Sequence, residues 1–313
     1  MPLLPQVRTV EEFQRSPRDE ATYRPAVEAI RARHGLGDGA LAKFAGGSTI
    51  VFSVGETHVV KLFEPIFAEA AETERAVLER VHGRLGLPTP GVVTAGELEG
   101  WRYVVMERLH GRSLLDVWDE ISPEEREALC AELGRAVARL HEVSADGLPL
   151  PLPDWDAFLR GQAETCVERQ RAHGVGEAWL AQIPAFLASV ELPRGPLVLM
   201  HTEIMRVHLL ARREGAGWAL SGLFDFEPAM RGAPEYEMAS VGFFVAGGDG
   251  PAFRAFLLGY GYREAELTHD LQRRILAYAL LHRYSNFRWY LDVLPPKSAT
   301  TFDALAAEWY AFG

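Results

Sequence analysis

The chain has 313 residues and a formal net charge of −11, with 48% hydrophobic and 24% charged residues. This length predicts two lobes or domains, and the composition is that of a globular protein with a substantial core. The acidic balance argues against a nucleic-acid partner and is compatible with a small cationic substrate. Cys130 and Cys166 have no metal-ligand spacing, and neither a secretion signal nor a membrane-length apolar run is evident, so the sequence predicts a cytoplasmic protein with no membrane partner.

The first third of the chain carries a β-rich pattern. Residues 1–20 are predicted to form an arm or loop, and residues 21–34 a short helix that stops at Gly35. Two apolar runs at 50–54 and 58–63, separated by a glycine turn, predict a β-hairpin.

A possible anion site precedes and includes this hairpin. The turn Gly46-Gly47-Ser48 would let backbone N–H groups approach a phosphate chain, because glycine has no Cβ. Lys61 lies inside an apolar strand, where it must reach solvent or meet an anion. A helix predicted over residues 66–85 could present Glu74 to Lys61. Each feature taken alone has a simpler explanation. The glycine turn could have no ligand, Lys61 could be a surface lysine, and Glu74 could be a solvated side chain.

The middle of the chain changes from strands to helices. Strands are predicted at 92–96 and 101–106, followed by a connector and helices at 113–120 and 122–142. The acidic side chains of these two helices could attract a polycation, but a solvated helix face is favoured; they are Asp116, Asp119, Glu120, Glu124, Glu125 and Glu127.

Further helices are predicted at 154–173 and 177–190, and after Pro234 at 251–259, 264–290 and 300–310. Together they would form a helical cap. Its large aromatic residues are candidates for a ring-stacking wall or for the core; they are Trp155, Trp179, Trp289, Tyr290 and Trp309.

Residues 197–228 contain the main group of candidate catalytic and metal-binding side chains. A short apolar strand leads to a loop with His201, Glu203 and His208, and a later strand at 218–224 ends on Asp225, with Glu227 two residues on. Carboxylates and imidazoles at the ends of buried strands are costly unless they have a function. This stretch is therefore the candidate active site.

The glycine turn, Val59-Val60-Lys61-Leu62-Phe63, the YVVMERLHG segment and the loop HTEIMRVH resemble the aminoglycoside phosphotransferases and related small-molecule kinases, over residues 41–244. The resemblance implies an α+β, protein-kinase-like fold with two lobes. Residues 1–108 would form a β-rich nucleotide-binding lobe, and residues 109–313 a mainly helical lobe that binds the acceptor.

The same resemblance implies ATP and Mg²⁺ as cofactors. Nucleotide contacts would fall on Gly46, Gly47, Ser48, Lys61, Glu74, Met106, Glu107 and Leu109. Glu203, Asp225 and His201 would be catalytic, and Asp225, His208 and Glu227 would be the metal positions.

Two residues of the loop depart from the family pattern. Glu203 stands where the family has Asp, and His208 stands where it has Asn, although imidazole is a poor magnesium ligand. Either Asp225 with Glu227 or Glu203 carries the metal while His208 hydrogen-bonds the loop or a phosphate, or phosphoryl transfer is altered or lost.

The sequence thus predicts an ATP-dependent phosphotransferase acting on a hydroxyl of a small cationic molecule, with aminoglycosides or amino-sugars favoured and antibiotic resistance as the associated role. It is expected to be a monomer or homodimer. One alternative is a kinase-fold protein that binds a nucleotide or small molecule without transfer. A remote one is a non-haem iron oxygenase using His201, Glu203 and His208, which leaves Lys61, Glu74 and Asp225 unexplained.

Overall fold

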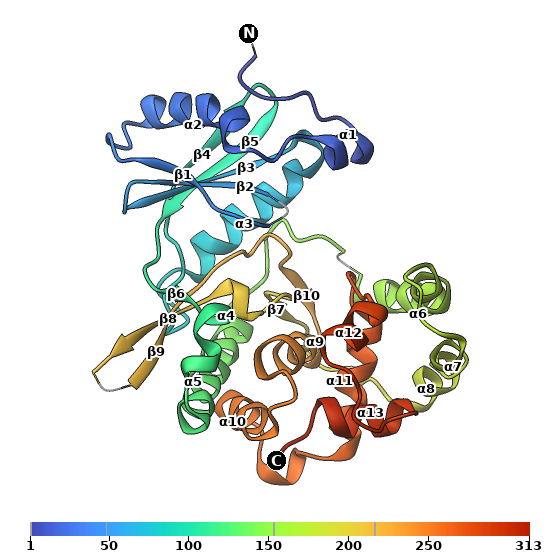
Figure 1. Ribbon diagram of the computed structural model, residues 1–313. Coiled ribbons are helices and arrows are strands. Elements are labelled where there is room, and N and C mark those ends of the chain that lie inside the picture. Colours follow the sequence, from blue (N-terminus) through green and yellow to red (C-terminus); the bar gives the residue numbers. More distant parts are fainter. Residues whose placement is uncertain (1, 48, 153, 216) are drawn as a thin grey trace.

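A computed structural model of the chain describes residues 2–47, 49–152, 154–215 and 217–313. A small β-rich lobe lies above a larger helical lobe, with the N-terminus at the top and the C-terminus at the bottom (Figure 1). The predicted α+β fold class is confirmed. Among the described residues, no helix combines the length and apolarity needed to cross a membrane.

The small lobe is built on a five-stranded antiparallel sheet in the order β1-β2-β3-β5-β4. Its strands are β1 (Leu41–Lys43), β2 (Ile50–Val54), β3 (His58–Phe63), β4 (Val92–Leu98) and β5 (Trp101–Glu107). The predicted hairpin is the β2–β3 pair, in which Val51 lies opposite Lys61. Side chains alternate between the faces of a strand, so Lys61 points away from the face that buries Val60 and Leu62.

Two helices lie over one face of this sheet, α1 (Val10–Arg15) and α2 (Glu20–His34). Tyr23, Val27 and Ile30 of α2 are buried in one cluster with the sheet side chains. The prediction of a loop over residues 1–20 was wrong where α1 forms. Thr9 caps that helix reciprocally with Glu12, an N-terminal signal that the apolar pattern alone does not reveal.

Helix α3 (Ala68–Val81) lies on the opposite side of the sheet, after the 3₁₀ turn η1 (Pro65–Phe67) (Figure 1). It is shorter than the helix predicted at 66–85. Its buried residues include Val77, Leu78 and the carboxylate residue Glu74. The helix therefore brings Glu74 to the side of the sheet where Lys61 points.

The large lobe is mostly helical. Its helices are α4 (Leu114–Val117), η2 (Trp118–Glu120), α5 (Pro123–Glu142), α6 (Trp155–Ala172), α7 (Glu177–Leu180), α8 (Ile183–Ser189), α9 (Pro234–Ser240), the π-helix η4 (Val241–Ala246), α10 (Gly250–Tyr260), η5 (Glu264–Glu266), α11 (His269–Leu281), α12 (Phe287–Val293) and α13 (Phe302–Trp309). Helix α5 begins with the predicted capping box of Ser122 and Glu125.

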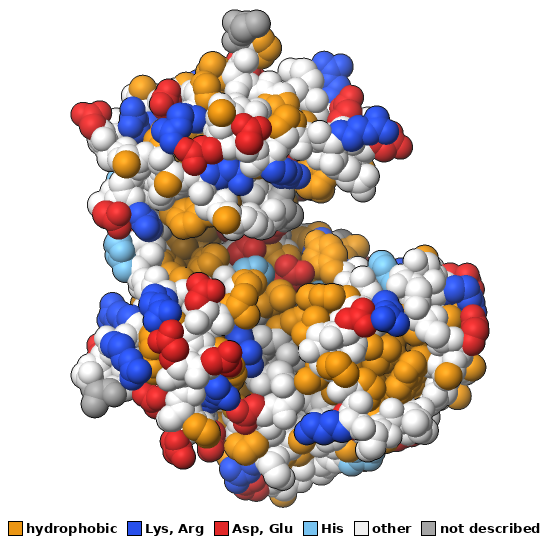
Figure 2. Space-filling view, viewed as in Figure 1, with side chains coloured by type: hydrophobic (Ala, Val, Ile, Leu, Met, Phe, Trp, Pro, Cys, Tyr) orange, Lys and Arg blue, Asp and Glu red, His pale blue; other side chains and the backbone are white. Residues whose placement is uncertain are grey.

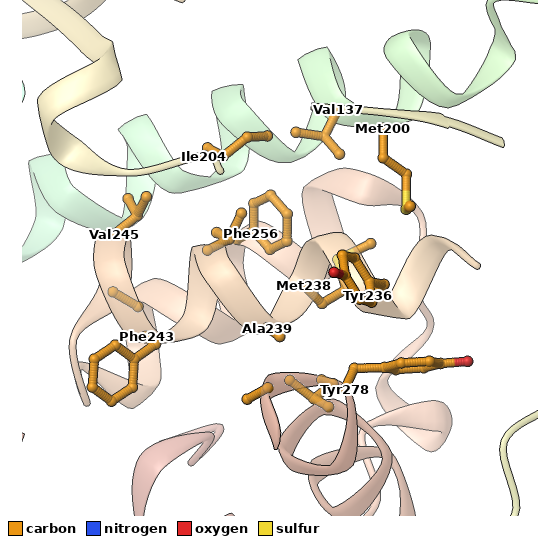
Figure 3. Close-up of a cluster of buried hydrophobic side chains, with 14 of the residues drawn as sticks. Val137, Met200, Ile204, Tyr236, Met238, Ala239, Phe243, Val245, Phe256 and Tyr278 are labelled. Atoms are coloured by element: carbon orange, nitrogen blue, oxygen red, sulfur yellow. The ribbon is translucent and has the colours of Figure 1, made fainter. Parts of the chain in front are cut away.

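Helices α5 and α10 form the tightest contact of this lobe. A Cβ on Gly134 would lie 2.1 Å from the carbonyl oxygen of Phe256, and one on Gly259 would lie 2.3 Å from that of Ala131. Both positions therefore require glycine. Figure 3 shows the adjoining core, where Val137 of α5 and Phe256 of α10 lie near Ile204 of the candidate catalytic loop.

Two small sheets carry the residues of the candidate site. The order β6-β8-β9 joins β6 (Arg112–Ser113), β8 (Leu209–Glu214) and β9 (Gly217–Leu223), and β10 (Met230–Gly232) pairs with β7 (Val198–Met200). The loop after β7 contains the 3₁₀ turn η3 (Arg206–His208). Asp225 follows β9, so both candidate segments start from strands anchored in the large lobe.

The helix predicted over residues 264–290 is interrupted. Helices α11 and α12 are separated by residues 282–286 because His282 adopts an extended backbone and its Nδ1 accepts the amide of Tyr284 at 3.2 Å. The helix predicted at 177–190 is also divided, into α7 and α8. The first of these breaks turns His282 and Tyr284 toward a pocket described below.

Candidate active site

Lys61 joins the two lobes through three carboxylates. Its Nζ lies 2.8 Å from Oε2 of Glu74, 2.5 Å from Oδ1 of Asp225 and 2.9 Å from Oε2 of Glu227. Only 5% of the Lys61 side chain and 1% of the Glu74 side chain are exposed. The structure therefore brings together the lysine and glutamate that the sequence paired, and places them beside the carboxylate that follows β9.

The charges of this cluster depend on one another. Burial disfavours the lysine cation, but the carboxylates of Asp225, Glu74 and Glu227 outweigh it and hold the pKa of Lys61 well above its usual range. Burial raises the pKa of Glu74 to about 7 against the opposing charge of Lys61. Burial would also raise the pKa of Asp225, yet Lys61 and His208 hold it below its usual value. Asp225 is therefore the carboxylate best kept ionised.

The backbone after β7 is strained, and buried contacts hold it. Thr202 has φ of 72°, which is rare for a β-branched residue. Glu237 of α9 accepts the amides of His201 at 2.7 Å and Thr202 at 2.8 Å. The carbonyl of Thr202 accepts Nε2–H of His282 at 3.2 Å. These bonds fix the turn that carries Glu203.

His201 lies behind the loop and not in the open cleft. Its Nε2 lies 2.9 Å from the carbonyl oxygen of Phe224, and its Nδ1 accepts the amide of Glu203 at 3.3 Å. The ring is fully buried, and burial lowers its pKa. Because both ring nitrogens are used, the geometry supports a positioning role for His201 and offers no free nitrogen for an iron ion.

His208 links the catalytic loop to Asp225. Its Nδ1 lies 2.6 Å from the carbonyl oxygen of Glu203, and its Nε2 lies 3.1 Å from Oδ2 of Asp225. Burial lowers the pKa of His208, but the hydrogen bond and charge of Asp225 outweigh that effect and raise it. The residue that replaces the family's Asn thus bonds the loop and the aspartate, one of the two arrangements expected from the sequence.

Glu203 is not one of the three carboxylates that pair with Lys61. It accepts no hydrogen bond from the described residues, and burial raises its pKa although the charge of His208 opposes this. A half-buried carboxylate with a raised pKa, on a loop fixed from behind, is suited to accept a proton.

Three carboxylate side chains at the cleft together offer the oxygen ligands of a magnesium site. Oxygen atoms of Glu74, Asp225 and Glu227 lie within 4.8 Å of one another. Magnesium prefers hard oxygen ligands, so these side chains fit the ion. Because Glu74 is also the buried partner of Lys61, Asp225 and Glu227 are the two residues best suited to hold it. Asp225 has φ of 75°, a conformation that Asp tolerates better than most residues.

The predicted nucleotide segments lie at the edges of the small lobe. Gly46 and Gly47 are exposed and have φ of 78° and 82°, which explains why glycine is required at both. Ser48 lies outside the described residues. Met106 and Glu107 end β5, and the backbone of Leu109 makes no hydrogen bond with another described backbone group. The segment after β5 therefore leaves the backbone N–H and carbonyl groups of Leu109 available to a ligand.

A pocket opens beside Glu203 in the large lobe. Its volume is about 120 Å³, and it is open to solvent on one side. It is lined by Thr202, Glu203, Met205, Ala239, Ser240, Phe243, Phe244, Ala279, His282, Tyr284, Trp289 and Tyr290. Of the predicted aromatic wall, Trp289 and Tyr290 line it, whereas Trp155 and Trp309 are buried in the core. Figure 2 shows hydrophobic side chains beside acidic ones on the floor of the hollow between the lobes.

Arg206 ties the loop to the wall of this pocket. Its guanidinium carbon lies 3.9 Å from the ring centroid of Trp118. Its Nε donates to the carbonyl of Val245 at 2.8 Å, and its Nη2 to that of Ala246 at 3.3 Å. Both carbonyls belong to the π-helix η4, a form that is frequent at functional sites. Arg206 thus fixes the helix that carries Phe243 and Phe244.

The model of the phosphotransferase enzyme family matches residues 41–273. The chain belongs to this family. The resemblance noted in the sequence is thereby confirmed, and it extends beyond the predicted end at residue 244.

Solved structures of the family share the fold. The GDP complex of wild-type aminoglycoside 2'-phosphotransferase-IIIa matches with a TM-score of 0.71 and 14% identity, over 87% of this chain and 96% of that one. The streptomycin–ATP complex of APH(2")-IIa matches with a TM-score of 0.62 and 16% identity, over 92% and 98%. Macrolide 2'-phosphotransferase MphH from Brachybacterium faecium matches with 0.60 and 21%, over 88% and 99%. The two-lobe, kinase-like fold is confirmed.

Three residues near the site were not anticipated. Glu237 fixes the strained turn, while Arg283 and Tyr284 lie at the break between α11 and α12. Glu237 is one of two glutamates in α9, just before an apolar run, and this is only a faint signal for it. For the other two there was none, because the pattern around them is that of a continuous helix.

Proposed function

We propose that this protein transfers the γ-phosphoryl group of ATP to a hydroxyl of a small molecule. Aminoglycosides and amino-sugars are the first acceptors to test, as the sequence favours them, and the macrolides join them because one structural neighbour is a macrolide phosphotransferase. The observation that carries the proposal is the buried Lys61 between Glu74 and Asp225, with Glu203 on the adjoining loop. The neighbours' complexes with GDP and with ATP support a nucleotide ligand.

Each residue has a distinct role in this mechanism. Lys61 binds phosphate oxygens, and Glu74 keeps its ammonium group oriented. Glu203 accepts the proton of the acceptor hydroxyl while that oxygen forms a bond to the γ-phosphorus. The bond from the γ-phosphorus to the bridging oxygen breaks, and ADP leaves with that oxygen. Magnesium, held by Asp225 and Glu227, would supply charge neutralisation of the phosphates.

The loop geometry supports this assignment. Glu237, His201 and His208 hold the backbone on both sides of Glu203, so its carboxylate needs little reorganisation during the reaction. His208 further orients Asp225 through its Oδ2 atom. These contacts support a positioning role for His208, which stands where the family pattern has Asn.

Binding without transfer is the second candidate. Its support is that His208 lies 3.1 Å from Oδ2 of Asp225, one of the two carboxylate oxygens that could bind a metal. Titration calorimetry with Mg-ATP, followed by an ATP-consumption screen over aminoglycosides, amino-sugars and macrolides, separates the two. Transfer to any of these acceptors establishes the kinase. Nucleotide binding with no transfer favours the binding protein, and absence of nucleotide binding contradicts the kinase.

A further inference from the structure

We infer that the acceptor is an alcohol with an apolar, ring-containing body and at most one positive charge. This inference rests on the proposed phosphoryl transfer and specifies what the pocket beside Glu203 selects. It departs from the polycationic acceptor that the sequence favoured.

The walls of the pocket are aromatic. The rings of Phe244 and Trp289 stack with centroids 5.1 Å apart and an interplanar angle of 27°, and the ring of Phe243 lies 5.0 Å from that of Tyr290. Trp289 is 43% exposed and Tyr284 is 52% exposed. Large aromatic rings exposed to water at a concave site are unfavourable, and covering them with an apolar ligand releases free energy because apolar surface leaves water.

The polar groups of the pocket are few and mostly occupied. The hydroxyl of Thr202 donates to the carbonyl of Pro228, and that of Ser240 donates to the carbonyl of Glu237. Among the lining residues, Glu203 alone has a carboxylate. Its carboxylate is therefore the strongest acceptor for the hydroxyl of a bound alcohol.

A guanidinium group lies beside the lining of the pocket. The guanidinium carbon of Arg283 lies 4.5 Å from the ring centroid of Tyr284, which lines the pocket. The buried Nη1 of Arg283 has no hydrogen-bond partner among the described residues. The lining thus holds one carboxylate with a guanidinium beside it, so it has no cluster of carboxylates to pair with several ammonium groups.

The acidic residues that the sequence highlighted do not supply that charge. Glu120 pairs with Arg112 at 2.7 Å, and Glu125 lies 3.5 Å from Arg213. Asp116, Asp119, Glu124 and Glu127 are likewise absent from the lining of the pocket. These four residues belong to α4, η2 and α5 and are exposed, which agrees with the solvated helix face that the sequence favoured.

Three probe ligands test how the apolar body and the charge of an acceptor each contribute to binding. They are 4-methylumbelliferyl β-D-glucoside, methyl β-D-glucoside, which has the same sugar without the bicyclic ring, and the polycation kanamycin. Calorimetric titration measures the binding of each with and without Mg-ADP, so that the result does not depend on turnover. The variants are Phe244→Ala and Trp289→Ala, with Phe67→Ala of the small lobe as the matched aromatic control.

We expect the aryl glucoside to bind at least about tenfold more tightly than methyl glucoside, and more tightly than kanamycin. Phe244→Ala and Trp289→Ala should remove most of that advantage, whereas Phe67→Ala should keep it. Equal affinity for the two glucosides, or tighter kanamycin binding that weakens with added salt, would overturn the inference. Kanamycin phosphorylation in that case would leave the proposed function standing. Absence of Mg-ADP and Mg-ATP binding would instead remove the proposed function.

Discussion

The ammonium group of Lys61 lies 2.5 Å from Oδ1 of Asp225, although 164 residues separate them in the chain. This contact joins the small lobe to the large lobe through two opposite charges. A phosphate chain and its metal compete for the same two side chains. Nucleotide binding must therefore exchange this ion pair for new contacts from each partner.

Lys61→Ala should weaken Mg-ATP binding by about ten- to a hundredfold, because a charge-assisted contact to phosphate contributes about 1.5–3 kcal/mol. Calorimetry on folded protein measures this. The variant also leaves Glu74 without its cation, so its unfolding midpoint should fall. Lys297→Ala, an exposed lysine far along the sequence, is the control and should change neither value. Unchanged affinity in Lys61→Ala would mean that the lysine does not touch the nucleotide.

Asp225→Asn should abolish the dependence of nucleotide affinity on Mg²⁺, because it removes the negative charge from the carboxylate best kept ionised. Glu227→Gln should weaken that dependence without abolishing it. Nucleotide titrations at several Mg²⁺ concentrations compare the two. Iron should bring no activity. Stoichiometric iron in purified protein, lost when His201 and His208 are replaced, would contradict this assignment and favour the oxygenase.

Glu237→Gln should lower the turnover number by about ten- to a hundredfold, with little change in nucleotide affinity. His201 and Thr202 donate their N–H groups to different oxygens of Glu237, and an amide replaces one of these oxygens with an NH2 group that cannot accept. Steady-state kinetics and calorimetry separate rate from binding. Glu235→Gln is the matched control on the same helix, since Glu235 pairs with Arg274 instead. Equal rates in the two variants would show that the strained turn does not need Glu237.

Acid should unfold the protein partly through His282. Burial lowers the pKa of this imidazole from 6.5 to about 4. The unfolded chain therefore takes up the proton first, and stability present above pH 6.5 is lost as the pH falls toward 4, by about 3 kcal/mol. Denaturant titrations of wild type and His282→Gln across this range measure the difference. The variant should show a shallower pH dependence, and the exposed His110→Gln should match wild type. Parallel curves for all three proteins would contradict this role.

The cluster around Lys61 could be predicted because its signals are local. A lysine in an apolar strand and an aspartate at a strand end are each visible in the sequence, and the order of segments supplied Glu74. The arrangement of the pocket could not be predicted from the sequence. It depends on the interruption of a helix at His282 and on the π-helix at Phe243, which hydrogen bonds to distant residues decide. The apolar period is the same on both sides of the interruption, so periodicity gave no warning.

In the proposed mechanism, Glu203 accepts the proton of a hydroxyl during phosphoryl transfer. Its carboxylate reaches about one carbon–carbon bond, ~1.5 Å, farther than the aspartate of the family pattern. A misplacement of about 1 Å can cost roughly a hundredfold in rate, so the loop must be adjusted to the longer side chain.

The most direct test is the turnover number of wild type, Glu203→Gln and Glu203→Asp on one identified acceptor, with the phosphorylated product followed by mass spectrometry. We expect product from wild type, almost none from Glu203→Gln, and a reduced rate from Glu203→Asp, all at similar Mg-ATP affinity. Full activity in Glu203→Gln, or a silent wild type that Glu203→Asp converts into a working kinase, would contradict the role of Glu203 as proton acceptor.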